Sequence, residues 1–460
     1  MKILRVGIFI TLPVLGFFAY SAVSPDYRYR VVIDPGHGGL SLNPVSLHGD
    51  KYDPVEKKYL SAYQQGAEYK NLHESEIAYE IALQVKDILD LTKTPGGREK
   101  FHQVLLKYDP LAETPREPIQ VILSRKKGYP VDDYDRYEGK TDKDYNADFR
   151  LFDFPDFVSG DRLPGLISRI NELRPDLVVS LHLDSEGPTY GAMASVVTPG
   201  YDTYKTALEY ANADAGGKRK ILREFKKGPY ENWIQMNGSR SGFEWFLCDA
   251  WIYFTGFWSV RNGLAADPSI FRGIRQDYVD WAYQGNSWRL TPEETRALKS
   301  RGLPSLQNFQ PTGAFWERER SQPEAWRREG GIEGIGGDNL YSSNELLRFI
   351  RLGLLANRAM SEKSLPDVRE PHWSTWSLPT YVNAVSAYIE LGFLNNRYDR
   401  ARIEKWKSLH AEAIAAGIYS LLYGLHRPDV KIPDMPVGKP LDLEKYKNID
   451  GRDYFKDVVR

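Results

Sequence analysis

The stretch YRYRVVIDPGHGG, residues 27–39, begins the pattern that decides the fold. The residues from Tyr29 to Ile33 predict a short strand, and the glycines that follow predict a turn that carries His37. Further along the chain, ESEIAYEIALQVKDILDL (74–91) repeats its apolar residues at helical spacing and has acidic residues in its first turn. The chain therefore starts its folded part with a strand that is followed by a helix.

The alternation of strands and helices continues to the end of the chain. Further strands are expected at 119–125, 176–184, 191–199 and 384–396, and further helices at 162–174, 342–360 and 401–425. Such alternation predicts an α/β fold with a largely parallel sheet. In folds of this kind, binding sites gather at the carboxyl ends of the strands.

The composition excludes several kinds of site. The 460 residues are 42% hydrophobic, which is enough for a sizeable core, and the formal net charge is -1. This balance gives no electrostatic reason to expect nucleic acid or an anionic membrane surface as a partner. The single cysteine, Cys248, excludes an intramolecular disulfide and cysteine-rich zinc motifs. A metal would have to be held by His, Asp or Glu.

The N-terminus has the pattern of an export signal. Two basic residues in MKILR precede an uncharged stretch from Val6 to Pro25, which predicts a signal peptide or membrane anchor over residues 1–25. Small residues at Ala19 and Ser21 favour cleavage, whereas the length of the stretch, about 20 residues, would also allow an uncleaved span. Either way, the sequence predicts an exported protein of the periplasm or cell envelope.

Four polar residues stand out at the ends of predicted elements. His37, His182 and Glu390 lie at or near the carboxyl ends of strands, and Glu74 begins a helix. Taken singly, each histidine could be a structural hydrogen-bonding residue, and Glu74 could complement its helix dipole. Glu390 is harder to explain in this way, because it lies between apolar residues, where an unpaired carboxylate is costly.

Together these residues match the needs of a zinc hydrolase. Two imidazoles and one carboxylate are a common three-ligand set for catalytic zinc, with a fourth position left for water. A second carboxylate that is not a ligand can take the proton from water and pass it to the leaving nitrogen. The sequence supplies candidates for both functions.

Five blocks of the sequence resemble, in order, those of the zinc amidases of the N-acetylmuramoyl-L-alanine amidase type 3 family. The blocks are VVIDPGHGG (31–39), ESEIAYEIAL (74–83), VILSR (121–125), DLVVSLHLDS (176–185) and IELGFLNNRYD (389–399). The resemblance implies a twisted, mainly parallel sheet flanked by helices and one Zn²⁺ per chain. Its zinc ligands would be His37, Glu74 and His182, and its catalytic residue would be Glu390. It also implies hydrolysis of the amide between N-acetylmuramic acid and L-alanine in peptidoglycan.

The sequence departs from the family pattern at several positions. The usual Glu-Lys pair is Glu74-Ser75 here, so His73 and Glu76 remain possible substitute ligands. Asp184 replaces the usual asparagine and either orients His182 or only hydrogen-bonds its own loop. Arg125 either positions substrate or fixes the end of its strand. The loop between His37 and Glu74 is longer than in the family. The other histidines match no ligand position in the family.

A segment rich in tryptophan separates the block of His182 from that of Glu390. Residues 200–340 hold eight of the eleven tryptophans. Three interpretations are open: a lid that an activating envelope protein removes, a platform on which sugar rings stack, or the core of an added subdomain. The expected division of the chain is 1–25 signal or anchor, 28–199 and 341–426 catalytic core, 200–340 insertion and 427–460 C-terminal tail.

Two alternatives to the amidase remain at this level. One is a catalytically silent envelope protein that binds peptidoglycan or a division partner. The other is a zinc peptidase that shortens the stem peptides. Intact candidates at all four site positions favour an enzyme, and the family blocks favour the amidase.

Overall fold

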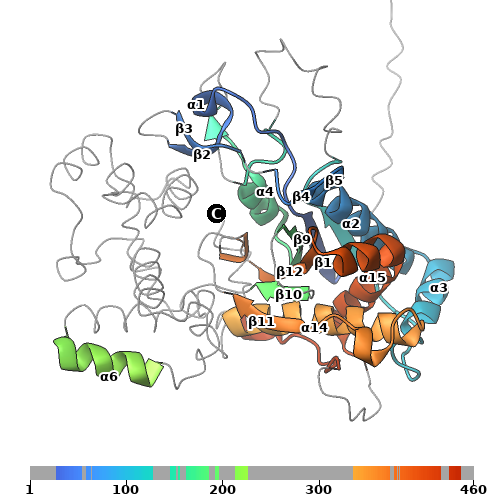
Figure 1. Ribbon diagram of the computed structural model, residues 1–460. Coiled ribbons are helices and arrows are strands. Elements are labelled where there is room, and N and C mark those ends of the chain that lie inside the picture. Colours follow the sequence, from blue (N-terminus) through green and yellow to red (C-terminus); the bar gives the residue numbers. More distant parts are fainter. Residues whose placement is uncertain are drawn as a thin grey trace, which may run out of the picture.

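The structure is a computed structural model that describes a core built from both halves of the chain (Figure 1). The described residues are 27–53, 58–63, 65–127, 146–151, 154–155, 162–185, 192–195, 213–225, 335–372, 378–380, 382, 384–425 and 435–446. The expected N-terminal segment and most of the tryptophan-rich insertion lie outside these ranges. Within them, no helix is long and apolar enough to cross a membrane.

A six-stranded sheet forms the centre of the core, in the order β11-β10-β12-β9-β1-β6. The strands are β1 (Tyr29–Pro35), β6 (Ile119–Leu123), β9 (Leu177–Asp184), β10 (Ala192–Ser195), β11 (Val368–His372) and β12 (Val385–Phe393). The four strands β6, β1, β9 and β12 run parallel to one another, and β10 runs antiparallel to β12. This arrangement confirms the predicted α/β class with a mainly parallel sheet.

Helices cover both faces of the sheet. The longer helices are α2 (Glu74–Asp90), α3 (Pro95–Leu105), α4 (Leu166–Leu173), α6 (Ala215–Phe225), α14 (Ile335–Ala356) and α15 (Arg397–Tyr423). The buried residues of α2, α14 and α15 form one cluster with alternate residues of β1, β9 and β12. The other face of β1 and β9 packs against Ile170 of α4, through Val32 and Val178. Strands buried on both faces explain the continuous apolar runs in the sequence.

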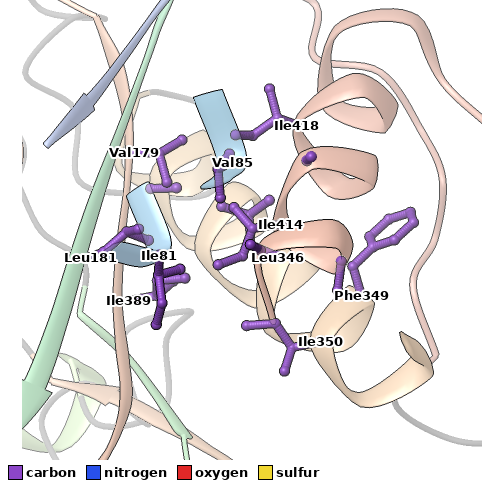
Figure 2. Packing of buried hydrophobic residues seen from close by; sticks show 14 of the residues in the cluster. Ile81, Val85, Val179, Leu181, Leu346, Phe349, Ile350, Ile389, Ile414 and Ile418 are labelled. Carbon is purple, nitrogen blue, oxygen red and sulfur yellow. The ribbon is translucent and has the colours of Figure 1, made fainter. Parts of the chain in front are cut away.

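The main core lies between the sheet and the three long helices (Figure 2). Ile81 and Val85 of α2 are completely buried, as are Ile389 of β12 and Ile414 of α15. The helical spacing in α2 places its apolar residues in one stripe that faces this cluster. The apolar period therefore fixes how α2 is rotated, and with it the position of Glu74 at its first turn.

The loop between His37 and Glu74 contains short elements that the sequence did not predict. They are α1 (Val45–His48), β2 (Asp50–Asp53), β3 (Lys58–Ser61), β4 (Glu68–Tyr69) and β5 (Leu72–His73). The side chain of Asn146 accepts a hydrogen bond from the backbone N–H of Leu40 at 2.7 Å and donates to the Leu40 and His48 carbonyls. This asparagine thus ties the long loop to a distant part of the chain.

The remaining short elements lie outside the sheet. They are β7 (Phe154–Pro155), β8 (Arg162–Leu163) and the 3-10 turns η1 (Leu91–Lys93), η3 (Glu362–Ser364), η4 (Leu378–Thr380) and η5 (Leu443–Tyr446). Part of the expected C-terminal tail, residues 435–446, packs on the core. The buried carboxylate of Glu345 in α14 accepts backbone N–H bonds from Val437 and Gly438, and Leu441 packs against the main cluster.

Candidate metal centre

The candidate site forms where β1 and β9 end and α2 begins. Gly36 extends β1 by donating its N–H to the Leu181 carbonyl of β9 at 2.8 Å, and His37 follows in a left-handed conformation with φ of 58°. Glu74 is the first residue of α2, and its N–H bonds to the Ala67 carbonyl at 2.9 Å. His182 lies near the end of β9. Parallel strand ends and one helix start thus bring the three side chains together.

His37, Glu74 and His182 converge on one another. Each offers a ligand atom, and these atoms all lie within 4.8 Å of one another. His182 Nδ1 is 3.0 Å from Glu74 Oε1, and His37 Nε2 is 3.7 Å from Glu74 Oε2. The two imidazole rings meet edge to face at 5.0 Å. Two imidazole nitrogens and a carboxylate oxygen around one point are a donor set that fits a divalent cation, so this group could hold a metal ion.

The carboxylate of Glu74 is held from several sides. It is 1% exposed and accepts backbone N–H bonds from Ala67 at 2.6 Å and from Leu183 at 2.9 Å. Burial by itself raises the pKa of a carboxyl, yet the pKa of Glu74 is lowered because His37, His182 and the Ala67 amide favour the ionised form. Burial likewise opposes the charged form of His182, but Glu74 raises the pKa of His182 above its usual range. The contacts around Glu74 therefore favour its ionised form.

Glu390 lies beside this group on the neighbouring strand. Its Cα pairs with that of His182 in the register of β12 and β9. The side chain is 8% exposed, and its Oε2 has no hydrogen-bond partner in the described part of the chain. Burial raises the pKa of Glu390 to about 8, with Glu74 and Asp184 acting in the same direction and His182 against them. A buried carboxyl with an unpaired oxygen beside three candidate ligands is available for proton transfer.

The other residues singled out from the sequence lie around this group. Arg125 donates to the carbonyls of Pro35 at 2.9 Å, Gly36 at 3.2 Å and Ser75 at 2.9 Å, and so ties together the backbone beside His37 and Glu74. Asp184 accepts a hydrogen bond from the N–H of Ser185 at 2.6 Å.

The two possible substitute ligands do not join the group. His73 pairs with Glu68 at 3.3 Å, and Glu76 is exposed on α2. Of the three neighbouring candidates, only Glu74 belongs to the potential metal-binding group among the described residues.

Three residues of the site were not singled out from the sequence. Tyr388 stacks its ring on that of His182 at 4.3 Å and 16°. Ser180 Oγ lies within hydrogen-bond distance of His182 Nε2 and donates a hydrogen bond to Asp34. The alternation of side chains along a strand could have placed Ser180 and His182 on one face, since they are two residues apart. The contacts with β1 and β12 depend on strand order and register.

The chain is similar to several solved structures of amidases. No family model matches the sequence, and no curated protein matches it. Among solved structures, the chain is similar to the N-acetylmuramyl-L-alanine amidase Ami1 from Mycobacterium smegmatis, with a TM-score of 0.31, 12% identity and coverage of 86% of this chain and 97% of that one. It is also similar to the amidase AmiC2 of Nostoc punctiforme, with a TM-score of 0.29, 13% identity and coverage of 85% and 95%.

A third solved structure contains an amidase together with a lipoprotein. It is the CwlD amidase from Clostridioides difficile in complex with the GerS lipoprotein, with a TM-score of 0.29, 13% identity and coverage of 85% and 96%. All three TM-scores are below 0.5. Of the three solved structures, the first two are N-acetylmuramoyl-L-alanine amidases and the third is an amidase in complex with a lipoprotein.

Proposed function

We propose that the chain is a zinc-dependent N-acetylmuramoyl-L-alanine amidase of the cell envelope. The observation that carries this proposal is the convergence of His37, Glu74 and His182 beside the buried carboxyl of Glu390, whose Oε2 has no hydrogen-bond partner among the described residues. A binding protein has no need to hold a carboxyl in this state next to a metal-binding group, whereas a hydrolase does.

Each side chain has a distinct part in the proposed reaction. His37, Glu74 and His182 hold the ion, and the two-imidazole, one-carboxylate set favours zinc among the divalent metals. Bound zinc would polarise the substrate carbonyl and make water more acidic. Glu390 accepts a proton from the attacking water and delivers it to the amide nitrogen as the carbon–nitrogen bond breaks. The products are a free carboxylate on the lactyl group of muramic acid and a stem peptide with a free L-alanine amine.

The choice of substrate rests on the five sequence blocks that resemble the type 3 amidases. Four of the blocks carry the proposed ligands and catalytic glutamate in the family's order. Export follows in the proposal from the segment 1–25, and peptidoglycan lies outside the cytoplasm. The proposed division into a catalytic core (28–199 and 341–426), an insertion (200–340) and a tail (427–460) leaves room for an activating envelope protein to act on the insertion.

Mass spectrometry of digested peptidoglycan tests the substrate. We expect the purified full chain, loaded with zinc, to release intact stem peptides that begin with a free L-alanine amine. Shortened stems would instead indicate a zinc peptidase. A chain that binds zinc and peptidoglycan without releasing any peptide, even after residues 200–340 are removed, would be a silent binding protein.

A further inference from the structure

A chain of buried hydrogen bonds leads from His182 away from the candidate metal centre. Ser180 Oγ donates to Asp34 Oδ2 at 2.7 Å, and His182 Nε2 lies 3.1 Å from the same Ser180 oxygen. Asp34 is 4% exposed, Ser180 is 0% exposed and His182 is 8% exposed. Asp34 and Ser180 are also register partners in the β1–β9 pair. The contact is therefore part of the sheet itself and does not depend on a loop.

The chemistry of Asp34 fixes the direction of this chain. An ionised carboxylate only accepts hydrogen bonds, and Asp34 accepts a second one from Ser124 Oγ at 2.5 Å. The single hydroxyl hydrogen of Ser180 is therefore committed to Asp34. Its oxygen can offer only lone pairs to His182, so the hydrogen between Ser180 and His182 has to be on His182 Nε2.

This direction determines which nitrogen of His182 can bind a metal. A neutral imidazole carries one hydrogen, and the nitrogen without it is the ligand. With the hydrogen on Nε2, the lone pair is on Nδ1, which lies 3.0 Å from Glu74 Oε1 on the side of the candidate ligands. In the metal-bound site, the opposite tautomer would direct an N–H at the metal position and leave the lone pair of Nε2 facing a lone pair of the Ser180 oxygen.

We propose that Asp34 and Ser180 are positioning residues that hold His182 in the Nε2–H tautomer, with Nδ1 directed to the metal. This inference rests on the proposed function, because it concerns the same metal ion. It assigns to Asp34, through Ser180, the orienting part for which Asp184 was a candidate from the sequence. Asp34 and Ser180 act through His182 and not on the substrate.

Zinc affinity measured by competition with a chromophoric chelator tests the proposal without recourse to activity. Ser180→Ala and Asp34→Ala are expected to raise the Kd for Zn²⁺ about 10- to 100-fold, as is usual for outer partners of a metal-binding histidine. Ser180→Thr keeps the hydroxyl and should restore the affinity. The matched control is Ser386→Ala, because Ser386 is a buried serine on the adjacent strand whose hydroxyl donates to the Ala384 carbonyl at 3.2 Å.

The tautomer itself can be observed in the wild-type protein. Long-range ¹H–¹⁵N spectra of the zinc-bound, ¹⁵N-histidine-labelled chain, assigned with His182→Asn, should show Nε2 carrying hydrogen and Nδ1 bound to metal. Metal binding through Nε2 would overturn the proposal, and this arm does not depend on a variant folding. Circular dichroism identifies any variant that fails to fold, and such a variant is left out of the comparison.

The proposed function and the proposed tautomer of His182 can be disproved independently. Wild-type protein that binds no zinc would overturn the proposed function. Wild-type protein that binds zinc, with unchanged Kd in folded Ser180→Ala and Asp34→Ala, would overturn only the inference about the tautomer.

Discussion

Gly66 is the residue that permits two of the candidate ligands to come together. Its φ is 97°, and a Cβ added there would lie 2.7 Å from Glu74 Oε2 and 2.8 Å from His37 Cβ. Gly66→Ala should therefore weaken zinc binding and also lower the free energy of unfolding by about 1–2 kcal/mol, since alanine resists a left-handed backbone. Chelator competition and urea unfolding measure the two effects.

The control for this substitution is Gly96→Ala in the first turn of α3. An added Cβ at Gly96 would meet no atom within 4 Å. We expect unchanged zinc affinity and a small gain in stability, because alanine is the better helix former. Equal zinc affinity in wild type and Gly66→Ala would show that Gly66 does not control the approach of the ligands.

Glu390 is expected to act on protons and not to hold the metal. Glu390→Gln keeps the size and a hydrogen-bonding group but removes the base, so turnover of peptidoglycan should fall about 10²- to 10⁴-fold while zinc remains bound. The rate of stem release measures the loss of turnover, and the zinc content of the same sample shows whether the metal remains bound. Undiminished turnover would exclude Glu390 as the proton carrier.

Residue types and positions at the ends of regular elements singled out His37, Glu74, His182 and Glu390, and the resemblance to the type 3 amidases selected the first three as ligands. The structure brings these three side chains together. The sequence could not predict the contacts of Asp34, Ser180 and Tyr388. Those contacts join β1, β9 and β12, which are far apart in the chain, and depend on strand order and register. The orientation of Asp184 was left open for the same reason.

Helix α2 holds Glu74 in place through the packing of its apolar residues in the core. Ile81 is completely buried in the main cluster, whereas Leu83 on the same helix is 40% exposed. Ile81→Ala should lower the free energy of unfolding by about 2–5 kcal/mol, because it leaves a cavity. Leu83→Ala should change it by no more than about 0.5 kcal/mol. Urea unfolding of the pair measures the difference, and equal effects would contradict the described packing of α2.

Helix α15 contains a buried histidine that makes stability depend on pH. His410 Nε2 lies 2.8 Å from Arg402 Nη1, and His410 Nδ1 lies 2.8 Å from the Trp406 carbonyl, at the kink in the helix. Burial and the charge of Arg402 lower the pKa of His410 to about 3. The native ring accepts from Arg402 and donates to Trp406, and so remains neutral.

The unfolded chain binds a proton at this residue below pH about 6.5, whereas the native chain does not until about pH 3. The contribution of the neutral His410 ring to the free energy of unfolding is therefore complete above pH about 6.5. It is lost as the pH falls toward 3, by about 1.4 kcal/mol per pH unit. His410→Gln can keep both hydrogen bonds without titrating. Urea unfolding at pH 7.5 and 5.0, with a chelator present, should show a smaller loss in the variant; parallel losses would contradict the neutral buried ring.

The elements of the parallel core could be predicted because fully buried strands and amphipathic helices leave clear periods in the sequence. Helix α2 and strands β1, β6, β9 and β12 fall close to their expected ranges. The antiparallel direction of β10 and the existence of β11 could not be predicted, since direction depends on how the chain returns to the sheet. The short hairpin of β2 and β3 has polar residues without a clear period.

At the scale of the whole molecule, the sheet joins two distant parts of the chain. Strand β12 lies next to β9, although about 200 residues separate them in the sequence, so Glu390 and His182 meet only when both parts are folded. Residues 435–446 also join the core, because the backbone N–H groups of Val437 and Gly438 donate hydrogen bonds to the buried Glu345 carboxylate of α14. The catalytic group proposed here therefore requires the assembled core.

The measurement that tests the central claim most directly is the zinc content of the purified full chain, compared with His37→Ala and His182→Ala. The account predicts one zinc per wild-type chain and a large loss of zinc from both variants, with each variant still folded by circular dichroism. Wild-type protein without zinc under metal-replete conditions, or folded variants that keep a full equivalent, would contradict the proposed metal centre.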